Sequence, residues 1–171
     1  MADFVVREAT EADFDQWFEV FEAVAAEAKW VGSEAPMDRD RRRAGYLETL
    51  VRNDATTFVV EGDGTVVGAL GIHGGSPGLY DLGMFLAPEW RGRGAGSALM
   101  ECCLAWAREH AAHKITLTLW PHNVAARALY EKFGFTVEGR FRRHYRRKSG
   151  ELWDAVAMGL VLDDESPGSA H

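Results

Sequence analysis

The sequence has little cysteine and no long apolar run. Its two cysteines, Cys102 and Cys103, are adjacent and so unsuited to pair with each other. With no others present, neither a disulfide framework nor a cysteine metal site is available. No run of about 18 apolar residues occurs, so we expect no membrane segment. The six histidines show no HExxH or similar close spacing, and we therefore predict no metal site.

Positive charge is also scarce, with 19 Lys and Arg against 26 Asp and Glu and a formal net charge of -7. This balance disfavours binding of nucleic acid over the whole surface and is compatible with a cationic small substrate. The N-terminal segment MADFVVREAT lacks the basic start and apolar stretch of a secretory signal, so we expect a cytoplasmic protein. The length of 171 residues predicts one domain over residues 1–162, followed by a polar, disordered tail at 163–171.

The first third of the chain has helical periodicity. A short strand is expected at residues 4–8, and Thr10 with Asp13 resembles a capping box that begins a helix. Apolar residues recur at helical spacing to about Lys29, and a more polar helix is expected over about 38–52. The Gly-, Ser- and Pro-containing loop between them, residues 30–38, is positioned to line a substrate mouth.

From residue 56 the period changes to two, which indicates strands. A hairpin is expected around residues 62–64, the segment GGSPG at 74–78 is expected to break the sheet, and a strand follows over 79–87. Further elements are expected as a helix at 94–110, a strand at 115–120, a short helix from Asn123 to Gly134, and strands at 135–143 and 152–162. The predicted class is α/β or α+β, with a mixed, mostly antiparallel sheet of about seven strands flanked by about four helices.

The segment PEWRGRGAGSALM, residues 88–100, places alternating glycines between a predicted strand and a predicted helix. The first turn of a helix offers unpaired backbone N–H groups and the positive end of the helix dipole to an anion. Gly92, Gly94 and Gly96 let a phosphate approach the backbone, and Arg91 and Arg93 add positive charge. The structural alternative is a glycine-containing turn with solvated arginines.

Neither the P-loop nor the GxGxxG dinucleotide motif occurs in the sequence. The segment R-G-R-G-A-G instead resembles the Gln/Arg-x-x-Gly-x-Gly/Ala motif of the GNAT superfamily of N-acetyltransferases, with Arg91, Gly94 and Gly96 at the defining positions. NVAARALYEKFGF, residues 123–135, is similar to the second cofactor segment of that family. The resemblance implies a GNAT-like fold and binding of the acetyl-CoA pyrophosphate at residues 91–97, that is Arg91, Gly92, Arg93, Gly94, Ala95, Gly96 and Ser97.

The helix that begins near Asn123 places Asn123, Ala126 and Tyr130 on one face. The resemblance implies that CoA lies along this face and that Tyr130 protonates the departing thiolate. The alternative for Tyr130 is a core tyrosine whose hydroxyl is satisfied by the protein. Lys132 either reaches a cofactor phosphate or lies on a solvated helix face.

An alkyl ammonium must lose a proton before its nitrogen attacks a thioester. Asp81 and Glu34 are the candidate bases. Backbone N–H groups of Met84, Phe85 and Leu86 are candidates to stabilise the oxyanion, and the family is similar in holding the thioester and pantetheine arm against this strand.

The predicted function is an acetyl-CoA-dependent N-acetyltransferase that acts on a primary amine through a ternary complex. A CoA-binding regulatory module without turnover is the alternative on the same fold, and a nucleic-acid binder using the basic segment RFRRHYRRK, residues 140–148, is the third hypothesis. A solvated hairpin is the structural alternative for that segment. The resemblance implies that a homodimer is one assembly to test, but the sequence identifies no interface and leaves polyamine, amino acid, antibiotic and protein N-terminus as acceptors.

Overall fold

The computed structural model describes residues 3–162, so the predicted tail at 163–171 lies outside the described residues. In chain order the elements are β1 (Phe4–Glu8), η1 (Glu11–Asp13), α1 (Phe14–Ala26), α2 (Arg39–Val51), β2 (Ala55–Gly62), β3 (Thr65–Ser76), β4 (Leu79–Leu86), η2 (Pro88–Trp90), α3 (Ala95–Glu109), β5 (Lys114–Leu119), α4 (Val124–Lys132), β6 (Thr136–Arg146) and β7 (Leu152–Val161), where η marks a short 3-10 helix. No helix among these described elements is long and apolar enough to cross a membrane.

The seven strands form one sheet in the order β1-β2-β3-β4-β5-β7-β6. Only β4 and β5 pair in parallel, and the other neighbours pair antiparallel. The predicted fold class, a mostly antiparallel mixed sheet with four α-helices, is therefore confirmed.

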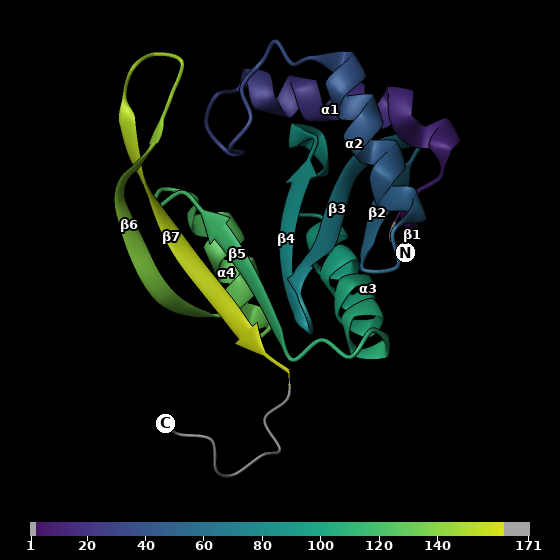
Figure 1. Ribbon diagram of the computed structural model, residues 1–171. Helices are drawn as coiled ribbons and strands as arrows, with labels where there is room; N and C mark the ends of the chain where they lie inside the picture. The colour runs from purple at the N-terminus through teal and green to yellow at the C-terminus, as the bar shows by residue number, and fades with distance from the viewer. Residues whose placement is uncertain (1–2, 163–171) are drawn as a thin grey trace.

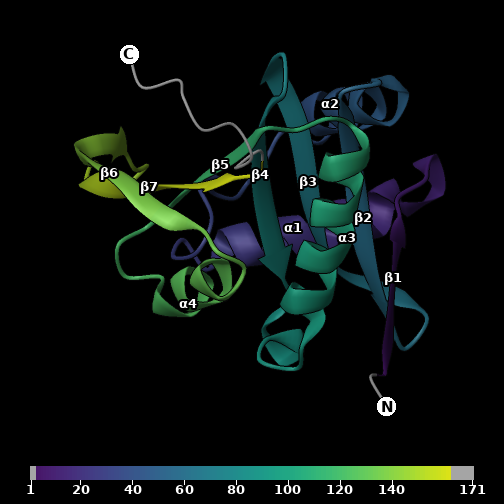
Figure 2. The same cartoon turned by 90° about the horizontal axis from the view of Figure 1, so that it is seen from below.

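The helices cover both faces of this sheet (Figures 1 and 2). On one face, Leu99 of α3 and Tyr130 of α4 share a buried cluster with Val60 of β2. On the other face, Trp17 of α1 packs against Val59, the neighbour of Val60. Successive side chains of a strand point to opposite faces, so α1 lies on the face opposite α3 and α4.

The sheet opens between β4 and β5. These strands pair only where Leu79, Tyr80 and Asp81 face Lys114, Ile115 and Thr116. Beyond Asp81 the strands diverge, as Figure 1 shows. The remaining length of β4 therefore has a strand neighbour, β3, on one edge only.

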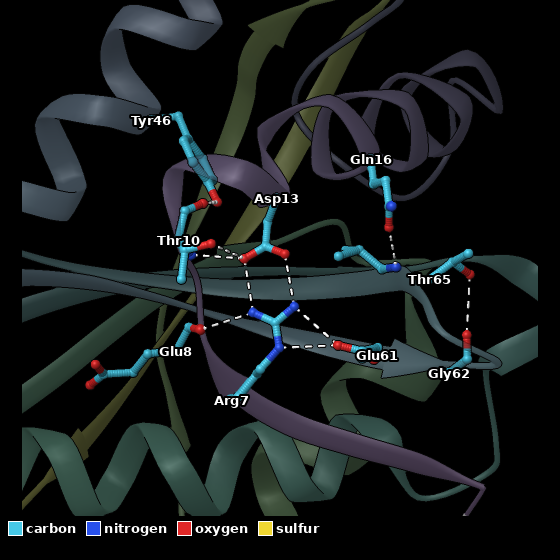
Figure 3. A network of polar contacts seen from close by, with 10 residues as sticks. Arg7, Glu8, Thr10, Asp13, Gln16, Tyr46, Glu61, Gly62 and Thr65 are labelled. Atoms are coloured by element: carbon cyan, nitrogen blue, oxygen red, sulfur yellow. Dashed lines mark hydrogen bonds and ion pairs between the residues drawn. The ribbon is translucent and has the colours of Figure 1, made fainter.

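A polar network fixes α1 and α2 on the sheet (Figure 3). The Arg7 guanidinium donates two 2.8 Å hydrogen bonds to the Asp13 carboxylate and also contacts Glu61 on β2 at 3.1 Å. Asp13 accepts from the Thr10 backbone N–H at 2.8 Å, which confirms the predicted capping role. Tyr46 of α2 donates to the Thr10 carbonyl at 2.7 Å. These contacts hold α1 and α2 against β1 and β2.

Two segments differ from the sequence prediction. The segment at 74–78 does not break the sheet at its first glycine, because β3 continues to Ser76 through a bulge and only residues 77–78 turn. The hairpin formed by β6 and β7 is mostly exposed on β6, as predicted, but Arg147 at its end is 4% exposed. Its guanidinium lies 5.1 Å from the Trp120 ring and 4.5 Å from the Trp153 ring. The end of the basic segment is therefore packed rather than solvated.

Candidate active site

The glycine loop places bare backbone at the start of α3. Gly92 and Gly94 have φ of 71° and 91°, a left-handed conformation that glycine adopts without steric cost. A Cβ on either residue would meet no other atom within 4 Å, so the surface above them is open. The first helical bond of α3 runs from the Ala98 N–H to the Gly94 carbonyl. Within residues 3–162, the N–H groups of Gly92 to Ser97 donate to no acceptor.

Both arginines of the glycine loop, Arg91 and Arg93, already contact other groups of the protein. Arg91 donates to both carboxylate oxygens of Glu27, at 2.6 and 3.0 Å, and its Nε donates to the Leu86 carbonyl at 3.0 Å. The hydrogen bond from Arg91 lowers the pKa of Glu27 below its usual value. Arg93 lies 4.3 Å over the Trp90 ring and 3.6 Å from Asp3. Arg91 thus joins the end of α1 to the end of β4, a role that its motif position did not indicate.

Lys132 of α4 places a positive charge beside the first turn of α3. Its Nζ donates to the Ser97 hydroxyl at 3.1 Å, although the residues are 35 positions apart. Gly96 lets the two helices approach, because a Cβ there would lie 3.0 Å from Leu129 Cδ2. The loop amides, Ser97 and Lys132 therefore form one cluster of donors.

The free edge of β4 continues from this cluster. The Ala87 N–H donates to the Val67 carbonyl on β3, whereas the Leu86 carbonyl points the other way, to Arg91. Because backbone groups alternate along a strand, the N–H groups of Met84 and Leu86 face the opening and that of Phe85 faces β3. Of the three predicted oxyanion donors, only the N–H groups of Met84 and Leu86 are therefore free at the strand edge.

A cavity of about 940 Å³ lies where the strands separate. Its wall includes the predicted residues Glu34, Asp81, Met84, Phe85, Asn123, Ala126 and Tyr130, but not Leu86, the loop residues 91–97 or Lys132. The free edge of β4 therefore leads from the cavity toward the glycine loop. The loop between α1 and α2 lines the cavity, as its composition predicts.

The ring of Tyr130 is buried, but its hydroxyl has no hydrogen-bond partner among the described residues. The residue is 6% exposed, with its ring centroid 5.7 Å from that of Phe135. The Tyr130 hydroxyl makes no hydrogen bond to any other described residue. Burial raises the pKa of Tyr130, and the negative charge of Asp81 acts in the same direction. The phenol therefore keeps its proton at neutral pH while it borders the cavity.

Asp81 borders the same cavity from β4. It faces His73 directly across the β3–β4 pairing, and the Thr116 hydroxyl donates to its carboxylate at 3.0 Å. Asp81 is exposed to solvent as a whole residue, while nearby protein atoms partly bury its carboxylate. This burial raises the pKa of Asp81 above its usual value.

Glu34 is held by the β6–β7 hairpin. Its carboxylate accepts from the Lys148 backbone N–H at 3.0 Å and lies 3.6 Å from the Arg147 guanidinium. The Lys148 Nζ donates to the carbonyls of residues 34, 35 and 36, and Arg147 donates to the Gly32 carbonyl at 3.1 Å. These contacts fasten the α1–α2 loop over the cavity.

Asn123 also has a structural partner, since its Oδ1 accepts from the Ala126 N–H at 3.2 Å and caps α4 as predicted. Sequence reasoning missed the cavity residues Arg41, Arg42, Trp120 and Tyr145. The arginines lie in a polar helix where no local pattern separates a cavity-facing cation from a solvated one.

The sequence profile of the acetyltransferase (GNAT) family matches residues 14–135. The L-amino acid N-acetyltransferase AaaT of Escherichia coli is 36% identical over 87 residues, which cover 48% of this chain and 51% of AaaT, so the match spans about half of that relative. The L-methionine sulfoximine/L-methionine sulfone acetyltransferase of Pseudomonas aeruginosa is 23% identical over 92% of this chain and 94% of its own.

The fold is also that of known acetyltransferase structures. The phosphinothricin acetyltransferase of Sinorhizobium meliloti, solved in complex with acetyl-CoA, superposes with a TM-score of 0.85 at 18% identity, over 98% of this chain and 95% of its own. The family match over most of the sequence shows that the chain belongs to the acetyltransferase (GNAT) family.

Proposed function

We propose that the protein transfers the acetyl group of acetyl-CoA to a primary amine by direct attack within a ternary complex. The observation that carries this proposal is the position of Tyr130. Tyr130 lines a large cavity beside the free edge of β4, and its hydroxyl makes no hydrogen bond to another residue in the part of the chain described. A proton donor in that position suits the departure of a thiolate.

The glycine loop suits the CoA diphosphate. The N–H groups of residues 92–97 have no acceptor within the described chain, and the positive end of the α3 dipole lies behind them. Lys132 adds one positive charge from α4. Arg91 contributes by holding the loop against Glu27, because its guanidinium already has a carboxylate partner.

The free edge of β4 suits the pantetheine arm and the thioester. The outward N–H groups of Met84 and Leu86 can donate to amide and thioester carbonyls, as a third strand would require. Met84 lines the cavity, and its N–H is the donor we assign to the thioester oxygen as that oxygen gains negative charge.

Asp81 is the base that we assign to the amine. Its raised pKa makes it a better proton acceptor than an ordinary aspartate, and the carboxylate has one hydroxyl partner, Thr116. Glu34 fits this role less well, because its carboxylate binds the hairpin through Lys148 and Arg147.

Asp81 and Tyr130 together account for the protons that the reaction moves. The amine nitrogen forms the new C–N bond while the C–S bond breaks, and the amine proton passes to Asp81. The sulfur receives the proton of Tyr130. Solvent then takes the proton from Asp81 and restores the one on Tyr130.

Thiol release from acetyl-CoA with a panel of primary amines tests this function. We expect turnover by the wild-type protein and a loss of roughly 100- to 10,000-fold in kcat for Tyr130→Phe, the range for general acid catalysis. The affinity for acetyl-CoA and the melting temperature should stay unchanged, because the hydroxyl contributes no hydrogen bond to the described fold.

Calorimetry with acetyl-CoA, set beside the thiol-release assay, distinguishes an enzyme from a module that binds CoA without turnover. Binding without thiol release from any amine would indicate a regulatory module on the same fold. Full turnover by Tyr130→Phe would remove this residue from the mechanism while leaving the enzyme assignment intact.

A further inference from the structure

Four arginines lie in the first two turns of α2, and they differ in their partners. Arg39 and Arg43 face away from the cavity and pair with Asp15 at 2.6 Å and Glu11 at 3.1 Å. Arg41 and Arg42 line the cavity, and neither has a carboxylate oxygen within 4.0 Å among residues 3–162. The chain has 26 acidic residues, so this lack of partners does not reflect a shortage of carboxylates.

The guanidinium of Arg42 is held in place without an anion. One of its nitrogens donates to the Ser33 hydroxyl at 2.7 Å, and its central carbon lies 5.2 Å from the Phe21 ring centroid. Phe21 in turn stacks on Phe85 of β4, with centroids 4.7 Å apart and planes at 15°. Arg42 is therefore positioned through aromatic stacking beside the strand that borders the thioester site.

Most of the donor capacity of Arg42 is unused. A guanidinium carries five N–H donors in a planar fork that matches a carboxylate. Ser33 is the one described hydrogen-bond partner of this side chain. Burial lowers the pKa of Arg42, with the charge of Arg41 acting in the same direction, so an anion at this position would relieve an unfavourable charge.

Apart from Arg41 and Asp81, the other charged side chains of the cavity wall that carry a full charge have partners within the protein. Lys148 is bound by three carbonyls, Glu34 by the hairpin, and Asp38 by the Arg41 N–H at the start of α2. Asp81 remains as an acceptor on β4. A ligand thus meets a positive group on α2 and a negative group on β4, which complements a molecule with a carboxylate and an ammonium.

We propose that Arg42 binds a carboxylate of the acceptor, so that the substrate class is a primary amine that also carries a carboxylate, as in an amino acid. This inference rests on the proposed function and deepens it. Aromatic and thioether side chains around the cavity, those of Trp30, Met37, Trp120 and Tyr145, suit an apolar body on that amino acid. The carboxylate contacts Arg42 while the amine lies toward Asp81 and the thioester.

Matched acceptors test the proposal. Phenylalanine, methionine and leucine are compared with their amides and their decarboxylated amines, in thiol-release assays at equal concentrations of neutral amine. We expect the wild-type protein to favour the carboxylates by at least about tenfold in kcat/KM, since a hydrogen-bonded pair with charged groups contributes about this much.

Arg42→Gln should lower kcat/KM for the carboxylates roughly 10- to 100-fold, mainly through KM, and leave the amides and amines unchanged. Arg42→Lys should restore part of the preference, because it keeps the charge without the fork. Arg43→Gln is the matched control, since it removes an arginine of the same helix that has its own carboxylate partner. It should leave the preference for carboxylates intact.

The outcomes separate this inference from the proposed function. Absence of thiol release with every amine tested would overturn both. Turnover without a preference for the carboxylates, or an equal effect of Arg42→Gln on all acceptors, would overturn the role of Arg42 and leave the acetyltransferase standing. If Arg42→Gln fails to fold, the comparison of acid with amide on the wild-type protein decides alone.

Discussion

Single residues in the cavity wall are kept in states that the fold does not favour. Tyr130 has an unpartnered hydroxyl, Asp81 a carboxylate in a partly desolvated position, and Arg42 a guanidinium without a counterion among the described residues. The partial burial of the charges on Asp81 and Arg42 costs stability, and a bound substrate can relieve that cost. Such groups gather at functional sites because catalysis and binding need polar groups that are not already satisfied.

The Asp81→Asn variant should lower activity without lowering the stability of the fold. The folded state raises the pKa of Asp81, so the native protein binds this proton more tightly than the unfolded chain does. Stability therefore falls as pH rises through that raised pKa, and a neutral Asn escapes the loss. We expect unchanged or increased free energy of unfolding at pH 7.5, measured by denaturant titration, together with a fall of roughly 100-fold or more in kcat.

Asp154→Asn is the control for this variant, because Asp154 accepts from Arg140 on the exposed hairpin and lies outside the large cavity. It should leave kcat unchanged. Normal turnover by Asp81→Asn would assign the base to another group or to water.

At the scale of elements, the junction of β4, the glycine loop and α3 forms the donor cluster. Strand β4 ends at Leu86, a short 3-10 helix turns the chain, and two left-handed glycines let α3 begin with its amides exposed. Arg91 holds this turn by bonds to Glu27 and Leu86. The proposed anion site is thus a property of the junction, and Arg91 maintains the geometry of this turn.

Gly94→Asp and Gly94→Asn test the anion site as a matched pair. Both side chains tolerate a left-handed conformation, and a Cβ at Gly94 meets no atom within 4 Å, so the two variants should fold alike. They differ in one negative charge beside the amides that we assign to the CoA diphosphate. We expect the dissociation constant for acetyl-CoA, measured by calorimetry, to be at least about tenfold higher for Asp than for Asn. Equal affinities would place the diphosphate elsewhere.

At the scale of the whole molecule, the network of Arg7, Asp13 and Glu61 joins the first strand to the helices that cover one face of the sheet. The hydrogen bonds from Arg7 lower the pKa of Asp13 to about 2. Ionised Asp13 therefore stabilises the fold above the pKa of about 4 expected for the unfolded chain, and this contribution is lost as pH falls toward about 2.

Asp13→Asn should lower the free energy of unfolding by about 2 kcal/mol at pH 7, and the difference from the wild type should vanish near pH 2. Urea titrations across pH measure both effects. Asp15→Asn is the comparison, since the Asp15 side chain is 68% exposed in its pair with Arg39 and should cost less than about 1 kcal/mol. A pH-independent loss in Asp13→Asn would show that packing, rather than charge, dominates this contact.

Local patterns of the sequence were sufficient for the order of the elements and for two segments of the site. Helical and strand periodicity located the seven strands and four α-helices within a few residues, because period and caps depend on neighbours in the chain. The Asn123 cap and the glycine loop were also recognisable, since each acts within one turn of backbone.

Only the tertiary structure decided the partners of individual side chains. Arg91 meets Glu27 from 64 positions away and Arg147 meets Gly32 from 115 positions away, and no local pattern encodes either contact. The same holds for the cavity, whose wall joins α2, β4, α4 and the β6–β7 hairpin. Backbone propensity is a local property and determined the elements, whereas the chemistry of the pocket depends on long-range packing, which determined which charges are neutralised and which remain for a substrate.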